Sequence, residues 1–186
     1  MGISLPVLVG FFPKMTERKP DWLKNKIVQE ICSVSACISK GPDHWIEQWK
    51  HNELGFYDSE VLARSIVQKN SQSFDLYAYK MYPVKFKMGQ VDSFEIPPHL
   101  TAKLFSYEFL GYDPVSRSAG SFFECSSLSC NHGADDFAVN QYCLIPQLED
   151  AYQACIEMSQ GRYEPGPYYL LEVYLEKARM TQCENV

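Results

Sequence analysis

The amino-acid sequence predicts a single α+β domain over residues 1–186, with a mainly antiparallel central sheet and helices packed on it. Strand-like segments recur along the chain, and helix-like segments are interspersed with them. Neighbouring strands in hairpin-like order argue against a parallel doubly wound sheet. A length of 186 residues suits one domain, and 46% hydrophobic residues with 12 Tyr and 11 Phe suffice for its core.

The first part of the chain predicts one strand and two helices. Residues 4–12 are apolar and are bounded by proline and glycine, as expected of a buried strand. Asp21 is a suitable N-cap for a helix whose apolar residues recur at near-helical spacing up to Ile31. A second, short helix is expected to start at residues 58–60 and to end near Val67.

The remaining elements alternate between strand and helix. Residues 74–86 are the clearest strand, although Pro83 indicates an edge or a bulge in its second half. Further strands are expected at residues 104–110, 141–145 and 168–175. A helix follows Pro146 and ends before Gly161. No repeat of 20–50 residues is visible.

Two hexapeptides are nearly identical: CSVSAC at residues 32–37 and CSSLSC at residues 125–130. Each is a Cys-x4-Cys unit, and together they hold four of the seven cysteines. Because small residues suit places where backbones approach closely, we expect the two segments to lie near each other with their thiols reduced. The four candidate metal ligands are Cys32, Cys37, Cys125 and Cys130.

Zinc is the metal that four such thiolates would hold. Cys-x4-Cys is a loose spacing for zinc ligands, and only a loop would bring both sulfur atoms of a unit together. We therefore expect these cysteines to be packed core residues without a cofactor, and zinc is the alternative.

The second hexapeptide also suggests an enzyme. Cys125 or Cys130 could form a thiolate–imidazolium pair with His132, oriented by Asp135 or Asp136. On a helix, His132 and the two aspartates would share one face and could hold a divalent cation. The simpler interpretation of the aspartates is that they complement a helix dipole.

Binding residues are expected elsewhere. Trp45 and Trp49 have i,i+4 spacing, and with His51 they could stack on a base or anchor a partner protein. Arg117 lies in a loop where it could grip a phosphate or a carboxylate. A core role for the tryptophans and an ion pair for Arg117 are the alternatives.

Charge and motifs point toward binding. The net charge is −6, and no Lys or Arg occurs between Arg117 and Arg162, where six acidic residues lie. This charge argues against duplex DNA as a partner. We expect a cytoplasmic protein without membrane contact for three reasons. The cysteine count is odd, no signal peptide is recognisable, and no long apolar segment is present.

No nucleotide-binding, hydrolase or EF-hand motif is present. We therefore expect a protein that binds another macromolecule through an acidic and aromatic surface, as an immunity protein, an inhibitor or a small subunit of a larger complex does. The alternative is a small hydrolase or transferase that uses a Cys/His pair or a His/Asp metal site within residues 125–136.

Overall fold

A computed structural model describes residues 4–35, 37–43, 50–69, 74–96, 100, 103–117, 123 and 125–177. The strands are β1 (Val7–Lys14), β2 (Glu17–Arg18), β3 (Glu30–Ile31), β4 (Asp75–Lys87), β5 (Gln90–Ser93), β6 (Tyr107–Ser116), β7 (Cys125–Ser126) and β8 (Tyr168–Glu176). The helices are α1 (Glu60–Lys69), α2 (Ser127–Cys130), α3 (Gly133–Asp136) and α4 (Leu148–Met158).

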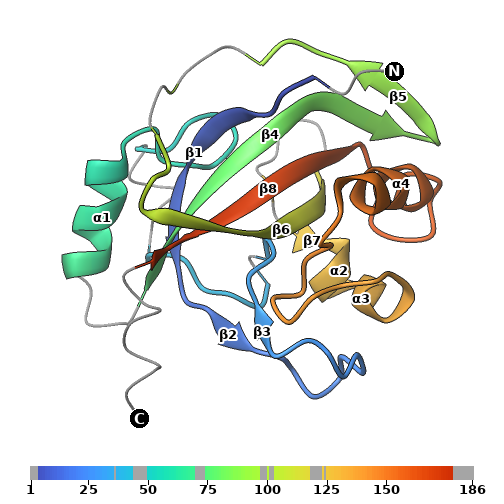
Figure 1. The fold of residues 1–186 in the computed structure, drawn as a ribbon, viewed down its shortest axis with the longest axis horizontal. Coiled ribbons are helices and arrows are strands. Elements are labelled where there is room, and N and C mark those ends of the chain that lie inside the picture. The colour runs from blue at the N-terminus through green and yellow to red at the C-terminus, as the bar shows by residue number, and fades with distance from the viewer. Residues whose placement is uncertain are drawn as a thin grey trace.

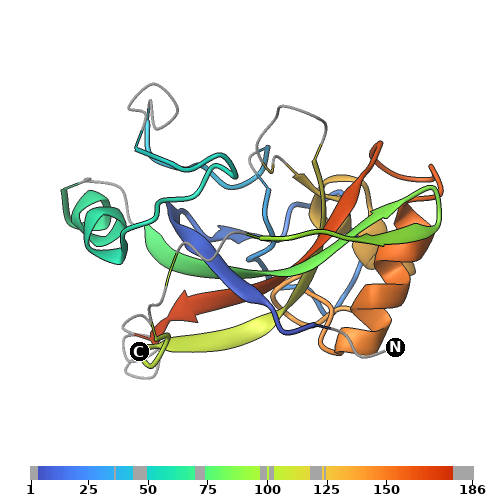
Figure 2. The ribbon, with the colours of Figure 1, turned by 90° about the horizontal axis from the view of Figure 1, so that it is seen from above.

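The main sheet is antiparallel and strongly curled, which confirms the predicted α+β class. Its strands lie in the order β1-β4-β8-β6-β7, and β5 pairs with β4. A separate small sheet pairs β2 with β3. Helices α1 and α4 lie at opposite ends of the main sheet (Figure 1, Figure 2).

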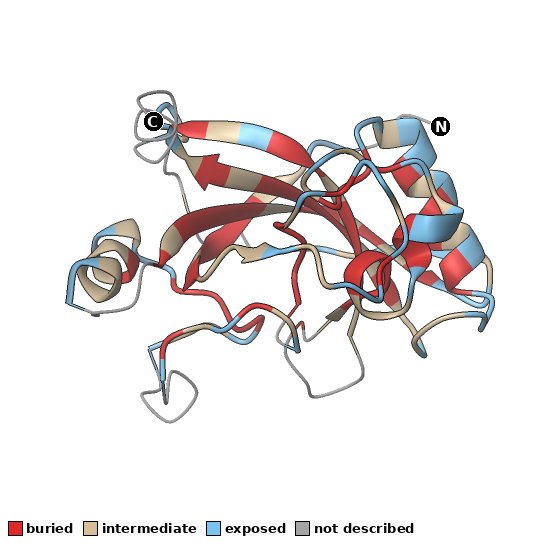
Figure 3. Cartoon of the chain, turned by 90° about the horizontal axis from the view of Figure 1, so that it is seen from below, coloured by how far each residue is buried: buried red, intermediate tan, exposed pale blue. Residues whose placement is uncertain are grey.

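Successive side chains of a strand point to opposite faces of the sheet. The side chains of the central strands therefore pack into different parts of the core. Tyr77, Tyr79 and Met81 of β4 pack with Cys32 of the first hexapeptide. Leu76 and Ala78, on the other face of β4, pack with Ala63 of α1. Buried residues dominate the central strands β1, β4 and β8, whereas exposed residues lie along the outward side of α4 (Figure 3).

The register of the sheet has an approximate two-fold symmetry. Tyr79 of β4 pairs with Val173 of β8 at the centre. The strands on either side of this central pair are joined to it in the same way. Gly10 of β1 pairs with Tyr79, and Gly111 of β6 pairs with Val173. A register shift directly precedes each of these two glycines. The first half (β1, α1, β4) and the second half (β6, α4, β8) therefore repeat one β-loop-α-β arrangement.

The two halves also share a loop that folds back on the outer strand. Asn52 Oδ1 accepts from the N–H groups two and four residues later, and its Nδ2 donates to the Val9 carbonyl at 2.8 Å. Asn140 makes the same set of bonds, with Nδ2 donating to the Leu110 carbonyl at 2.7 Å. The loops then bridge to Phe11 and Tyr112, the residues that follow the two glycines.

Two local expectations differ from the structure. Residues 21–29 form no helix, because the Asn25 side chain accepts from the N–H groups of Ile27 and Val28 and so competes with helical hydrogen bonds. The segment expected as a strand at residues 141–145 is the Asn140 loop, with a single bridge to β6. The edge strand β5 was not expected from the sequence.

Within the described residues, no helix combines the length and the hydropathy that crossing a bilayer requires.

Candidate metal centre

The two hexapeptides lie side by side, which confirms the expectation that they meet in the fold. The N–H of Ser126 donates to the Val34 carbonyl at 2.6 Å, and Ser35 forms an isolated bridge with Cys125. The Ser33 hydroxyl donates to the Ser129 hydroxyl at 2.8 Å. Small side chains at these positions allow the backbones to approach this closely.

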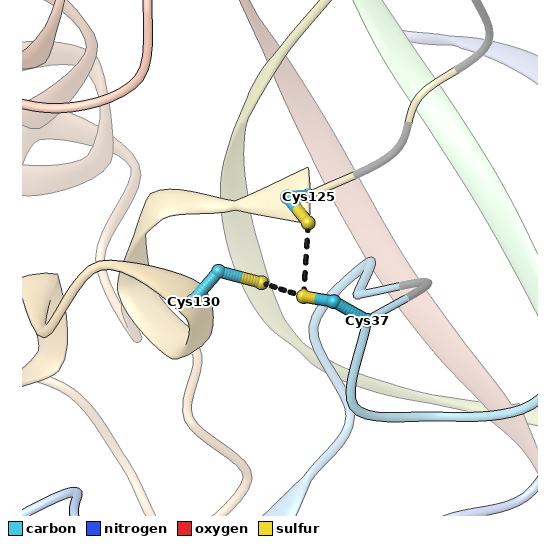
Figure 4. Close-up of side chains that lie close together, drawn as sticks. All are labelled: Cys37, Cys125 and Cys130. Carbon is cyan, nitrogen blue, oxygen red and sulfur yellow. Dashed lines mark hydrogen bonds between the residues drawn. The ribbon is translucent and has the colours of Figure 1, made fainter.

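Three cysteines from the two hexapeptides bring their sulfur atoms together. Cys37 Sγ lies 3.0 Å from Cys125 Sγ and 2.7 Å from Cys130 Sγ (Figure 4). All three sulfur atoms lie within 4.8 Å of one another. The three cysteines are free thiols, and their separations exceed the S–S bond length of about 2.05 Å in a disulfide. We call Cys37, Cys125 and Cys130 the thiol cluster.

Local structure holds each member of the thiol cluster in place. Cys125 lies in β7 and pairs with Ser116 of β6. Cys130 ends α2, whose N-cap residue Ser126 accepts from the Leu128 N–H. Cys37 lies in a turn closed by hydrogen bonds from residues 38 and 39 to the Ser35 carbonyl.

Two buried charged residues fasten the first hexapeptide to the sheet. The Lys14 ammonium donates to the carbonyls of Cys32 and Ser33 at 2.9 and 2.6 Å. Asp113 Oδ2 accepts from the Val34 N–H at 2.6 Å. Burial lowers the pKa of Lys14 to about 8 and raises the pKa of Asp113 to about 7.

Hydrogen bonding distributes charge unevenly over the thiol cluster. Hydrogen bonds lower the pKa of Cys130 to about 6, although burial opposes this. The hydrogen bond from Cys125 has the largest effect, and those from Cys37 and Ser35 have smaller ones. The pKa of Cys125 is raised because its thiol donates to Cys130, and the pKa of Cys37 is raised chiefly by burial. Cys130 is therefore the member of the thiol cluster that loses its proton most readily.

The residue types in the cluster fit a thiophilic ion. Thiolates select Zn²⁺ and Cu⁺ over hard cations. Tetrahedral zinc with Zn–S bonds of about 2.3 Å sets its sulfur ligands about 3.8 Å apart. The observed S···S distances of 2.7 and 3.0 Å would thus have to lengthen by roughly 1 Å on binding.

Cys32, the fourth expected zinc ligand, lies outside the thiol cluster. It is fully buried, and its sulfur accepts from the Tyr77 hydroxyl at 3.5 Å. The Ser35 hydroxyl lies beside the thiol cluster, 3.1 Å from Cys130 Sγ and 3.6 Å from Cys37 Sγ. The structure therefore brings together three of the four sequence-predicted ligands.

His132 and the two aspartates are directed to other partners. His132 Nδ1 lies 3.7 Å from Asp135 Oδ2, and its ring packs edge-on against Trp22 at 4.9 Å. Asp136 accepts from the Tyr163 hydroxyl and lies 3.4 Å from the Arg162 guanidinium. Among the described residues these groups form no metal cluster, since only the three cysteines do.

The expected binding residues lie elsewhere. Arg117 donates to the Glu53 carbonyl at 2.9 Å and lies over the Phe123 ring. His51 contacts the Asn52 carbonyl at 3.0 Å. Trp45 and Trp49 fall outside the described residues.

Comparison with known proteins gives no relative. No family model, no curated protein and no solved structure matches this chain.

Proposed function

We propose that this protein is a zinc-binding domain in which Cys37, Cys125 and Cys130 hold one ion and leave its fourth coordination position open. The observation that carries the proposal is the convergence of three sulfur atoms from segments 88 and 93 residues apart in sequence. Two structural features support it: the first hexapeptide is anchored by buried charges, and the second begins in a strand and ends in a capped helix.

Zinc would join the two halves of the chain across the thiol cluster. With three protein ligands, the fourth position would take a water molecule or a ligand from solution or from a partner, the arrangement typical of zinc sites that react. Cys37 is exposed, so solvent reaches the cluster. Among the described residues, His132 contacts Asp135 and Trp22 and not the thiols, so no histidine base is in place beside them. This weakens the alternative of a cysteine enzyme.

Metal content of the protein purified without chelator tests this proposal. We expect about one zinc ion per chain in the wild type. Substituting any one of the three clustered cysteines by serine removes a ligand and should reduce zinc retention at least tenfold. The matched control is Cys155→Ala, which removes a buried cysteine of α4 outside the cluster and should keep the metal.

A wild-type protein that stays metal-free after incubation with zinc would overturn the proposal. Retention of the ion by the three serine variants would also overturn it. If no metal binds and Cys130 alone is alkylated rapidly at neutral pH, the thiol enzyme becomes the better account.

A protein partner remains a second candidate function. The outward side of α4 supports it, because Glu149, Asp150 and Glu157 are exposed there and α4 has no basic residue. Such a surface would attract a basic partner and speed its association. A partner that co-purifies at low salt and is lost at high salt would support this function, whereas a chain that purifies alone at both salt concentrations would argue against it.

A further inference from the structure

A second site lies next to the thiol cluster, in a cavity of about 110 Å³. Phe12, Phe56, Tyr79 and Phe123 form its aromatic walls, and Lys14 and Ser39 are among its polar residues. The Phe56 ring stacks on Tyr79 at 4.6 Å and on Phe123 at 5.9 Å, so the walls are held in place by one another. Ser35 lines the cavity and also contacts Cys130, so the two sites are neighbours.

Ser39 is the first indication of a ligand. It is 97% buried, with 3% of its surface exposed, yet its hydroxyl has no hydrogen-bond partner in the part of the chain that the structure describes. A buried hydroxyl without a partner is costly and uncommon, and it calls for an explanation. A ligand acceptor atom in the cavity would supply the missing bond.

Lys14 is the second indication. It is 3% exposed, and its contacts are two backbone carbonyls and the face of the Tyr77 ring. Within the described residues no carboxylate lies within ion-pair distance of its ammonium, and Asp113 and Asp75 act on it only at longer range. A buried ammonium without a contacting counter-ion favours an anion in the cavity that it lines.

The same place in the second half of the fold is built differently. The sheet register matches Lys14 with Val115 and Tyr79 with Val173, and the two Asn loops match Phe56 with Leu144. These three counterparts are aliphatic and fully buried. Lys14, Tyr79 and Phe56 therefore have no polar or aromatic equivalent at the matching positions of the second half.

We propose that this cavity binds a small monocarboxylate, with the carboxylate at Lys14 and Ser39 and a short apolar tail between the aromatic rings. One positive charge matches one negative charge. The volume of about 110 Å³ is smaller than the roughly 150 Å³ cavity that admits benzene. Acetate and propionate fit this size, whereas benzoate does not.

Calorimetric titration of the full chain in carboxylate-free buffer at neutral pH tests the proposal. The probes are acetate, propionate, butyrate and benzoate, together with propionamide as a neutral analogue of propionate and inorganic phosphate as another anion. We expect millimolar or tighter binding of acetate or propionate, at least tenfold weaker binding of propionamide, and no binding of benzoate.

Two substitutions at Ser39 locate the site. Ser39→Ala removes one hydrogen bond and should weaken propionate binding about 5–10-fold. Ser39→Leu fills the cavity and should abolish binding, provided that its circular dichroism and thermal transition show a folded protein. Ser106→Ala is the matched control, because Ser106 is exposed and does not line the cavity.

The proposal fails if no carboxylate of the series binds to the wild type, or if propionamide binds as tightly as propionate. Preference for phosphate over every carboxylate would also overturn it, in favour of an inorganic anion site. If the Ser39→Ala variant binds propionate as tightly as the wild type does, the carboxylate binds elsewhere on the protein. Should Ser39→Leu not fold, the Ser39→Ala result and the ligand series decide the question.

Discussion

At the scale of single residues, two buried ionisable side chains organise the site. Lys14 and Asp113 hold the first hexapeptide through three backbone groups. Both stand in strands between apolar neighbours, where a charged residue gives no sign of being buried or exposed. The cysteines were predicted from their repeated spacing, but which three would meet depends on tertiary contacts that spacing does not encode.

Asp113 should make stability depend on pH. Its folded pKa of about 7 lies above the ordinary value of 3.8, so between these values the folded state binds more protons than the unfolded state. The stabilising contribution is complete below pH 4 and is lost as the pH rises to 7. The loss is about 4 kcal/mol at most, since one pKa unit corresponds to about 1.4 kcal/mol.

The Asp113→Asn variant tests this dependence, because asparagine can still accept from the Val34 N–H but does not ionise. Urea unfolding at a series of pH values from 4.5 to 7.5 should show the variant gaining stability relative to the wild type as the pH rises. Asp150→Asn, at an exposed position of α4, should show no such trend. A constant difference between wild type and Asp113→Asn would contradict the account.

At the scale of elements, the sequence pattern predicts most strands of the main sheet and both helices that pack on it. It does not predict the segments around the site. The expected strands at residues 74–86 and 168–175 correspond to β4 and β8, and the two expected helices at residues 58–67 and 146–161 correspond to α1 and α4. The strand expected at residues 104–110 covers only the first part of β6, which continues through Gly111 to Ser116. Their periodic apolar patterns reflect burial on one side. The segment at residues 21–31 and the Asn140 loop are held by side-chain-to-backbone bonds, which leave no periodic signal.

Gly111 allows the Asn140 loop to approach β6 closely. Its φ is +149°, and an added Cβ would lie 2.8 Å from Leu144 Cβ and 3.0 Å from the Ile145 carbonyl oxygen. Gly111→Ala should therefore lower the free energy of unfolding by about 2–4 kcal/mol through strain and overpacking. The symmetry-related Gly10→Ala should cost a similar amount, since its Cβ would lie 2.4 Å from Phe56 Cβ.

Chemical denaturation measures both effects against Gly161→Ala. Gly161 has a φ of +96° and open space around it, so the control isolates backbone strain at about 1 kcal/mol. Equal losses at positions 111 and 161 would mean that the close approach of the loop adds nothing to the cost.

At the scale of the whole molecule, the chain is a β-loop-α-β arrangement used twice. The sequence carries a trace of this, because GFFP at residues 10–13 and GYDP at residues 111–114 occupy equivalent places in the sheet. Asn52 and Asn140 are a second trace. Both are too short and too widely spaced to stand out without the register that relates them.

Against this symmetry the thiol cluster is asymmetric, and that asymmetry bears on its function. The second hexapeptide supplies two of its cysteines and the first supplies one, because Cys32 turns into the core toward Tyr77. A symmetric use of both Cys-x4-Cys units would give four thiolates and a closed zinc site. Three thiolates would leave one position of the proposed zinc ion without a ligand from the described residues.

Zinc-edge X-ray absorption of the zinc-loaded protein tests for this open position, because it counts the sulfur ligands and measures their distances. We predict three sulfur atoms at about 2.3 Å and one lighter atom, oxygen or nitrogen, at about 2.0 Å. The Cys37→Ser protein, if it retains any zinc, should show one sulfur fewer. A first shell of four sulfur atoms in the wild type, or one without sulfur, would contradict the account.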